Sequence, residues 1–332
     1  MIFATLFDKN YLSRGITLYN SIKDNCKCFT FYVLALDEFT NNYLDNANFE
    51  NLKIINLREL EEFDTGLADS KNNRTLIEYY FTISPCLPLY ILNKFNADHV
   101  CTLDADLFFY STPESIFEKL DEYSVIITPH KFSNSLIHLN SYGLYNVSFQ
   151  IFKNNTVALN CLNIWRNDCL NSCNDVNVIG ENFADQKYLD KWPNLLNKEL
   201  YILNDNISGI APWNVSNYNL KYINNILFSN NEKVIFFHFH DFKIFNKYFI
   251  TDNLSAFGYK KNNLDKLYKD YFLKNMDFFR KNNFFINNST RFTNTGSLYT
   301  KLLSYKYIYF LNSFFMIKIN LKIFTFLIKK NV

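Results

Sequence analysis

V-C-T-L-D-A-D-L-F-F-Y, residues 100–110, decides the fold, because an apolar run ends at Asp104 and Asp106. In a parallel sheet, ligands bind at the carboxyl ends of the strands. Residues i and i+2 of an extended chain point to the same side, which predicts that the two carboxylates converge there. A solvated acidic loop has the same D-x-D pattern, but the apolar strand before it favours a metal site. Such oxygen ligands suit Mg²⁺ or Mn²⁺.

Apolar runs at residues 2–7, 29–36 and 52–57 predict further strands, and apolar spacing over residues 11–22 predicts a helix between the first two. Strands that are apolar on both faces and alternate with helices are typical of a mostly parallel sheet covered on both sides. The sequence therefore predicts an α/β fold. Further strands are expected at residues 99–103, 125–128, 145–152 and 233–240, and helices at residues 76–92, 156–170 and 183–192.

Two breaks in this pattern carry their own predictions. Pro85 and Pro88 lie inside the helix expected at residues 76–92, and proline removes a helical hydrogen bond, so that helix should be kinked or divided. Asn146 begins the strand expected at residues 145–152, where its amide could meet sugar hydroxyls. Trp213 could stack on a sugar or belong to the core.

The segment V-I-F-F-H-F-H-D-F-K, residues 234–243, holds a second candidate group of ligands. His238 and His240 have i, i+2 spacing, and imidazole suits Mn²⁺ better than Mg²⁺. Lys243 follows and could contact a phosphate as a point charge. A strand with two partly buried histidines is the alternative interpretation.

Three motifs in this order resemble the GT-A glycosyltransferases, and most of all their retaining family 8 type. They are D-A-D at 104–106, A-D-Q-K-Y-L-D at 184–190 and H-F-H-x-x-K at 238–243, and the resemblance extends over about residues 1–245. The chain also resembles a related bacterial group through R-x-x-x-E-Y-Y-x-T-x-x-P at 74–85 and A-P-W-N at 211–214. The resemblance implies a Rossmann-like GT-A fold with a mostly parallel central sheet.

The resemblance also implies roles for single residues. Asp104, Asp106 and His238, with His240 as the alternative, would bind Mn²⁺ or Mg²⁺. Asp185 and Gln186 would lie against the donor sugar as the catalytic pair. The residues implied to bind the nucleotide and its phosphates are Thr5, Phe7, Asp8, Arg74, Tyr80 and Lys243. Lys243 departs from the family pattern, because its spacing is one residue shorter and Ile244-Phe245 replaces the family's Pro-Trp.

The chemistry of Asp185 and Gln186 bears on the stereochemical course. An amide is a poor nucleophile, so Gln186 favours retention by attack on the same face of the sugar. Asp185 is the nucleophile if a covalent route operates, and an acid that favours a helix N-terminus if it does not.

The C-terminal segment differs in charge from the rest of the chain. Residues 278–332 carry nine Lys or Arg and no Asp or Glu, which gives this segment a charge of +9. Because the net charge of the whole chain is +2, residues 1–277 carry a net charge of −7. The apolar run at 307–317 is shorter than the roughly 20 residues of a membrane span. With Lys318, Lys322 and Lys329 it predicts a basic amphipathic helix on an anionic membrane surface. Docking on the catalytic domain and a dimer contact are alternatives, and no base-reading module supports nucleic-acid binding.

These features predict a catalytic domain at residues 1–260 and a helical, basic and aromatic extension at residues 261–332. The N-terminus is expected to be a first strand and not a signal peptide, and the seven cysteines are expected to be reduced. We therefore expect a cytoplasmic enzyme on the inner face of the cell membrane. It would move a sugar from a nucleoside-diphosphate sugar to a glycan or glycolipid.

Two other functions remain open. A sugar nucleotidyltransferase usually has a glycine-rich phosphate loop near its first strand, and only Gly15 is present here. A non-catalytic sugar- or membrane-binding protein of the same fold would not need an intact D-x-D with a histidine partner.

Overall fold

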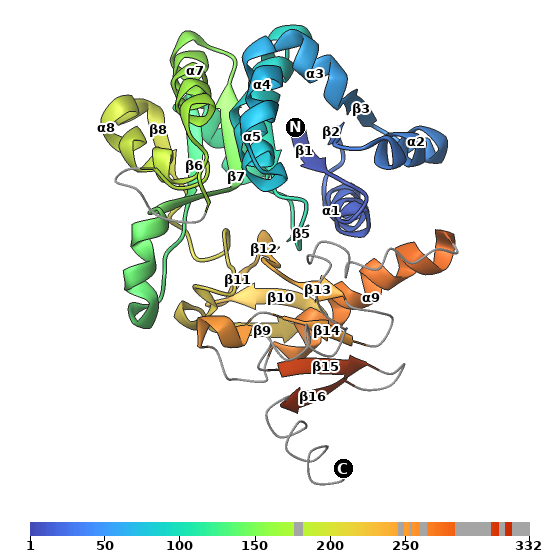
Figure 1. Ribbon diagram of the computed structural model, residues 1–332. Helices are drawn as coiled ribbons and strands as arrows, with labels where there is room; N and C mark the ends of the chain where they lie inside the picture. The colour runs from blue at the N-terminus through green and yellow to red at the C-terminus, as the bar shows by residue number, and fades with distance from the viewer. Residues whose placement is uncertain are drawn as a thin grey trace, which may run out of the picture.

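The computed structural model describes residues 1–175, 182–244, 249–252, 254–258, 264–282, 307–311 and 316–320. Its centre is a seven-stranded sheet in the order β3-β2-β1-β4-β7-β6-β8 (Figure 1). All pairings are parallel except those of β7, which runs against both β4 and β6. The strands are β1 (Ile2–Phe7), β2 (Thr30–Ala35), β3 (Leu52–Asn56), β4 (His99–Leu103), β6 (Val125–Pro129), β7 (Tyr145–Lys153) and β8 (Leu200–Ile202). The mostly parallel α/β sheet is as predicted.

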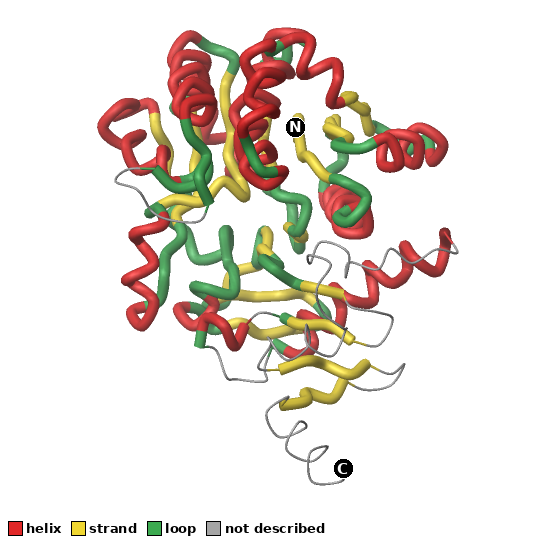
Figure 2. The backbone as a smooth tube through the Cα atoms, in the orientation of Figure 1, coloured by secondary structure: helices red, strands yellow, loops and turns green. Residues whose placement is uncertain are grey.

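Helices cover both faces of this sheet, as apolar strands require. The buried cluster on one face includes residues of α5, α7 and α8, and the cluster on the other face includes residues of α1, on which α9 packs. Figure 2 shows helices on both sides of the sheet. The helices are α1 (Leu12–Asn25), α2 (Glu38–Ala47), α3 (Leu57–Phe63), α4 (Thr65–Ser70), α5 (Leu76–Lys94), α6 (Glu114–Phe117), α7 (Thr156–Asn171), α8 (Trp192–Leu196) and α9 (Asp265–Asn282). Short 3₁₀ helices include η3 (Asn134–Tyr142) and η4 (Lys187–Lys191).

Smaller sheets lie beside the large one, below it in Figure 1. The strand β5 (Leu107–Phe109) pairs with β12 (Phe236–His238), and a three-stranded sheet contains β9 (Leu220–Ile223), β10 (Ile226–Ser229) and β11 (Glu232–Lys233). A four-stranded sheet contains β13 (Lys243–Ile244), β14 (Phe249–Thr251), β15 (Tyr307–Leu311) and β16 (Met316–Asn320). The strand predicted at residues 233–240 is therefore divided between β11 and β12.

The helix α5 is continuous over 19 residues, so of the two expected effects of Pro85 and Pro88, a kink or a division, the division does not occur. The helix begins with a capping box. The Glu78 amide donates to Thr75 Oγ1 at 3.2 Å, and the Thr75 amide donates to Glu78 Oε2 at 2.8 Å. Most of the helix is buried against the sheet and α7. We infer that this packing outweighs the two helical hydrogen bonds that proline cannot donate.

The α-helix predicted at residues 183–192 is also wrong. Ala184 has φ +47°, a left-handed conformation that an α-helix cannot contain. Residues 184–186 instead form a turn, followed by η4 and then α8. The turn matters because it carries Asp185 and Gln186.

The C-terminal extension is helical only in part. The helix α9 packs on α1, whereas β15 and β16 are antiparallel strands in the segment predicted as an amphipathic helix. Aromatic and β-branched residues in Tyr307–Leu311 and Met316–Asn320 favour strands. Lys322, Lys329 and Lys330 lie outside the described residues, and the domain boundary at residue 260 stays a prediction.

Among the described residues, no helix is both long enough and apolar enough to cross a membrane.

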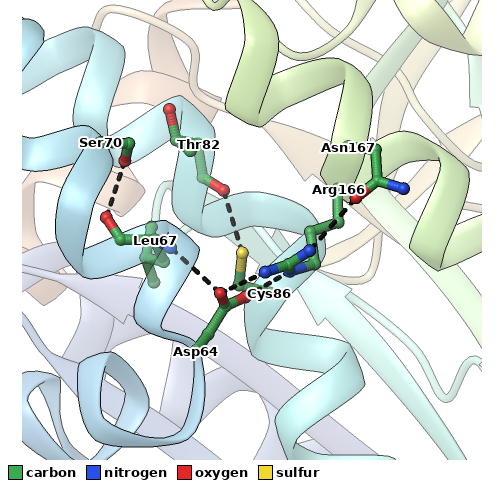
Figure 3. A network of polar contacts seen from close by, with 7 residues as sticks. All are labelled: Asp64, Leu67, Ser70, Thr82, Cys86, Arg166 and Asn167. Atoms are coloured by element: carbon green, nitrogen blue, oxygen red, sulfur yellow. Dashed lines mark hydrogen bonds and ion pairs between the residues drawn. The ribbon is translucent and has the colours of Figure 1, made fainter.

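A buried ion pair joins α4 to α7 (Figure 3). Asp64 caps α4, where its Oδ1 accepts a hydrogen bond from the Leu67 amide at 3.0 Å. Arg166 of α7 donates to both oxygens of the same carboxylate. The Asp64 side chain is 5% exposed, so its charge depends on this bidentate partner.

We expect Arg166→Ala to lower the free energy of unfolding by about 3 kcal/mol, because the Asp64 charge stays buried without its partner. Urea denaturation at pH 7 measures this. Arg58→Ala is the matched control, since Arg58 and Glu62 form an exposed pair worth less than about 1 kcal/mol. Equal losses in the two variants would contradict the assignment.

The same pair predicts a pH dependence. Burial acts to raise the pKa of Asp64, but hydrogen bonds from Arg166 and Leu67 outweigh it and lower the pKa below 3.8. The ionised pair therefore contributes stability above the ordinary pKa and loses it as the pH falls through the lowered value. The difference in unfolding free energy between wild type and Arg166→Ala should shrink below pH 3.8.

Candidate active site

The pairing of β5 with β12 brings the predicted metal ligands together. In this ladder His238 lies opposite Leu107, the residue that directly follows Asp106 in the chain. The Phe239 amide donates to the Asp106 carbonyl at 3.0 Å, and the Asp104 amide donates to the Ser148 carbonyl at 2.9 Å. The backbone on both sides of the site is therefore fixed by hydrogen bonds.

Asp104, Asp106 and His238 each offer one ligand atom, and these atoms lie within 4.8 Å of one another. His238 Nε2 is 3.0 Å from Asp106 Oδ1 and 3.6 Å from Asp104 Oδ2. The predicted convergence is thus present, but its cause differs from the prediction. Ala105 and Asp106 form a turn after β4, so the carboxylates do not alternate along an extended strand.

The charges of the three groups are coupled. Burial acts to raise the pKa of Asp106, but the charge and hydrogen bond of His238 lower it to about 2. Burial likewise acts to lower the pKa of His238, and Asp106 outweighs it, so the pKa is raised. Burial raises the pKa of Asp104, an effect that water in the cavity moderates because the side chain is 41% exposed. Two carboxylates and one imidazole are a donor set that could hold a divalent cation.

His240 lies next to this group and is not part of it. Its ring centroid is 5.4 Å from that of His238 and 5.1 Å from that of Trp213. Burial, with the charge of His238, lowers the pKa of His240 to about 4. The geometry therefore favours His238 over His240 as the third ligand.

A cavity of about 630 Å³ opens over the three candidate ligands. It is lined by predicted site residues from β1, α5, β7 and the turn before η4. Those residues are Thr5, Phe7, Asp8, Tyr80, Asn146, Asp185 and Gln186.

Arg74 and Lys243 do not line this cavity. Arg74 Nη2 donates to the Leu170 carbonyl and so ties the start of α5 to α7. Lys243 Nζ lies 2.7 Å from Asp241 Oδ1, in the segment that follows His240. The contacts to the nucleotide and its phosphates that the resemblance implies for Arg74 and Lys243 stay predictions.

Several buried donors in the cavity wall have no hydrogen-bond partner among the described residues. They include Thr5 Oγ1, Asn146 Nδ2 and Gln150 Nε2. Unpaired buried polar groups are costly, so these groups are suited to a polar ligand. Gln150 was missed in the sequence, and the register of β7 against β6 is irregular between Asn146 and Ile151, so regular strand alternation would not have indicated it.

Asp185 and Gln186 are held in the cavity wall by contacts from three elements. Ser84 Oγ of α5 donates to Asp185 Oδ2 at 2.5 Å, and Trp165 Nε1 of α7 donates to the Asp185 carbonyl at 2.9 Å. Gln186 Nε2 donates to the Tyr142 carbonyl at 3.0 Å. Burial raises the pKa of Asp185 to about 7, and the Ser84 hydrogen bond opposes this. No motif in the sequence indicates Ser84.

Trp213 belongs to the wall of the cavity beside the histidines. Its indole Nε1 donates to the His130 carbonyl at 2.9 Å, and its ring meets His238 edge to face at 5.2 Å. The side chain is 5% exposed. This arrangement fits a packing role that orients the imidazoles better than a free stacking platform.

We expect His238→Ala to weaken Mn²⁺ binding at least tenfold, because it removes one of three ligand atoms. His240→Ala, a matched change two residues away, should weaken it less than His238→Ala does, because His240 is not one of the three candidate ligands. Calorimetric titration with Mn²⁺ measures both. The reverse order would move the ligand to His240.

Comparison with known proteins finds relatives of this chain. The chain is 27% identical to the uncharacterized proteins YfnD and YfnF of Bacillus subtilis strain 168, over 245 and 251 residues. These alignments cover 73% of this chain, and 78% of YfnD and 82% of YfnF. No protein-family model matches the chain.

Solved structures also share the architecture. The galactosyltransferase LgtC, in complex with donor and acceptor sugar analogues, superposes with a TM-score of 0.56 at 13% identity. This match covers 85% of this chain and 99% of LgtC. An active-site variant of LgtC gives a TM-score of 0.52 at 12% identity, over 83% of this chain and 96% of that one. The chain therefore has the α/β fold of the GT-A glycosyltransferases.

Proposed function

We propose that the protein is a metal-dependent glycosyltransferase that moves a sugar from a nucleoside-diphosphate sugar to a glycan or glycolipid. The observation that carries the proposal is the group of Asp104, Asp106 and His238 at the carboxyl end of β4, on the wall of a 630 Å³ cavity. A cavity of this size is in the range of ligand sites. The GT-A fold, on which LgtC binds donor and acceptor sugar analogues, supports the assignment.

The donor set fits a divalent cation and favours Mn²⁺ over Mg²⁺, because one of its three ligands is an imidazole. When bound, the cation would supply positive charge beside the diphosphate. His238 Nε2 and Asp106 Oδ1 lie 3.0 Å apart, so two of the candidate ligand atoms are already close together.

The nucleoside-diphosphate sugar would lie against the unpaired donors of β1 and β7. Thr5, Asn146 and Gln150 would donate to its oxygens, and Asp185 would accept from a hydroxyl while Ser84 holds its other oxygen. Lys243 would have to leave Asp241 to contact a phosphate. Arg74, which donates to the Leu170 carbonyl, is given no phosphate contact.

Transfer with retention of configuration is part of the proposal. An amide is a poor nucleophile, and Gln186 already donates to the Tyr142 carbonyl. Asp185 has a raised pKa of about 7, which reduces its ionised fraction and hence its strength as a nucleophile at neutral pH. Both observations favour attack by the acceptor on the face that the leaving group vacates.

The alternative function, a sugar nucleotidyltransferase, would use a glycine near the first strand in a phosphate loop. Gly15 lies inside α1, where a side chain would come within 2.2 Å of the Phe7 ring. Close packing on Phe7 thus explains the glycine without a phosphate loop. The other alternative, a non-catalytic protein of the same fold, would not turn over a sugar donor, and this distinguishes it from the proposed glycosyltransferase.

Hydrolysis of nucleoside-diphosphate sugars tests the function. A panel of donors is screened for thermal stabilisation with and without Mn²⁺, and donors that bind are assayed for release of the nucleoside diphosphate. We expect Asp106→Asn to reduce turnover at least a hundredfold, as an order-of-magnitude estimate for a lost metal ligand. Asp98→Asn, an exposed acid at the other end of β4, should leave it unchanged.

A wild type that neither binds nor hydrolyses any donor would favour the non-catalytic rival. Formation of a nucleoside-diphosphate sugar from a nucleoside triphosphate and a sugar phosphate would favour the nucleotidyltransferase.

We also propose that the basic C-terminal segment holds the enzyme on the cytoplasmic face of an anionic membrane. The support is its nine positive charges and the absence of any acidic residue after Asp277. Each basic residue near an anionic surface contributes about 1 kcal/mol. No nucleic-acid partner is proposed, because charge alone does not identify one.

Replacing Lys318, Lys322, Lys329 and Lys330 by Gln should weaken binding to anionic vesicles, measured by co-sedimentation, and leave donor hydrolysis intact. Substitution is preferable to truncation, because β15 pairs with β14 and its removal exposes an edge strand. Binding of the wild type should also fall as salt rises, since screening acts over about 10 Å at 0.1 M. Equal binding to neutral vesicles would exclude this role.

A further inference from the structure

Exposed apolar side chains are concentrated at the mouth of the cavity. Of the twelve large apolar side chains exposed in the described part of the chain, five come from two segments beside it. They are Leu76, Ile77, Ile137, Tyr142 and Leu144. Leu76 and Ile77 begin α5, and the other three belong to η3 or to the two residues after it. The remaining seven are spread over other parts of the described chain.

Three residues of these segments line the cavity itself, namely Ile77, Leu139 and Tyr142. We call these three the apolar rim. Ile77 is 49% exposed and Tyr142 is 39% exposed. The rim therefore presents hydrocarbon to the solvent at the entrance of a cavity that also contains the three candidate metal ligands.

The rim is linked to the turn that carries the candidate catalytic residues. The Tyr142 carbonyl accepts the hydrogen bond from Gln186, and the Tyr142 ring meets Phe183 edge to face at 4.8 Å. Phe183 also lines the cavity. An apolar group on the rim would thus lie next to the place where the acceptor hydroxyl must attack.

We propose that the apolar rim binds an alkyl or lipid aglycone of the acceptor. The inference rests on the proposed function and narrows its acceptor to an amphipathic glycoside. A purely polar acceptor would gain nothing from these exposed side chains, whereas burying one CH₂ group favours binding by about fourfold. A second copy of this chain seated on the rim would close the cavity mouth, so the acceptor is the better occupant.

Binding of alkyl glycosides tests the inference without knowledge of the natural acceptor. Octyl and methyl β-D-glucoside are titrated into the full-length protein by calorimetry, below the critical micelle concentration of the octyl compound. We expect the octyl glucoside to bind roughly tenfold tighter or better, since several CH₂ groups are partly buried. Ile77→Asn with Leu139→Asn should remove that preference.

Ile164→Asn is the matched control, because Ile164 is 43% exposed on α7 and does not line the cavity. It should keep the preference for the octyl glucoside. The single variant Ile77→Asn, at an exposed position, should lose part of the preference for the octyl glucoside. It replaces the double variant in the test if circular dichroism shows that the double variant is unfolded.

Three outcomes would overturn the inference. They are equal binding of the two glucosides by the wild type, equal loss in the control, and a dimer in sedimentation that only Ile77→Asn with Leu139→Asn dissociates. The last would assign the rim to a second copy. Donor hydrolysis by the wild type is measured in parallel. If the proposed function is wrong, the wild type hydrolyses no donor. If only the inference is wrong, the wild type hydrolyses a donor but binds the two glucosides equally well.

Discussion

The antiparallel pairing of β5 with β12 is the contact on which the site depends. Asp104 and Asp106 come from the end of β4, and without β12 they would be two neighbouring carboxylates in a turn. The register Leu107 to His238 adds the imidazole and, through the Phe239 amide, fixes the Asp106 backbone. The same register places His238 in the cavity wall, edge to face with the Trp213 ring at 5.2 Å.

Local sequence patterns predicted most of the central sheet, because buried parallel strands are apolar on both faces and end at polar residues. They also indicated Asp104, Asp106 and His238 as candidate metal ligands, which the pairing of β5 with β12 brings within 4.8 Å of one another. Contacts through space were not predictable in the same way. Ser84 reaches Asp185 only because α5 packs over the sheet, and nothing in the residues around Ser84 marks it.

The wrong predictions share a cause, which is that local propensity yields to tertiary packing. Pro85 and Pro88 should break a helix, yet α5 is held by its buried faces. Residues 183–192 have helical spacing, yet the left-handed Ala184 turns Asp185 into the cavity. The apolar run near the C-terminus has no fixed period, and pairing with β14 makes it a strand.

The β5–β12 pairing also has a consequence for folding. It joins segments about 130 residues apart in the chain, and closing so long a loop has a high entropic cost that is met only when the intervening structure forms. The three ligands are thus brought together late, and a nascent chain that ends before β12 has no complete site. A cation that binds only the finished arrangement would stabilise the native state by mass action and would report that folding is complete.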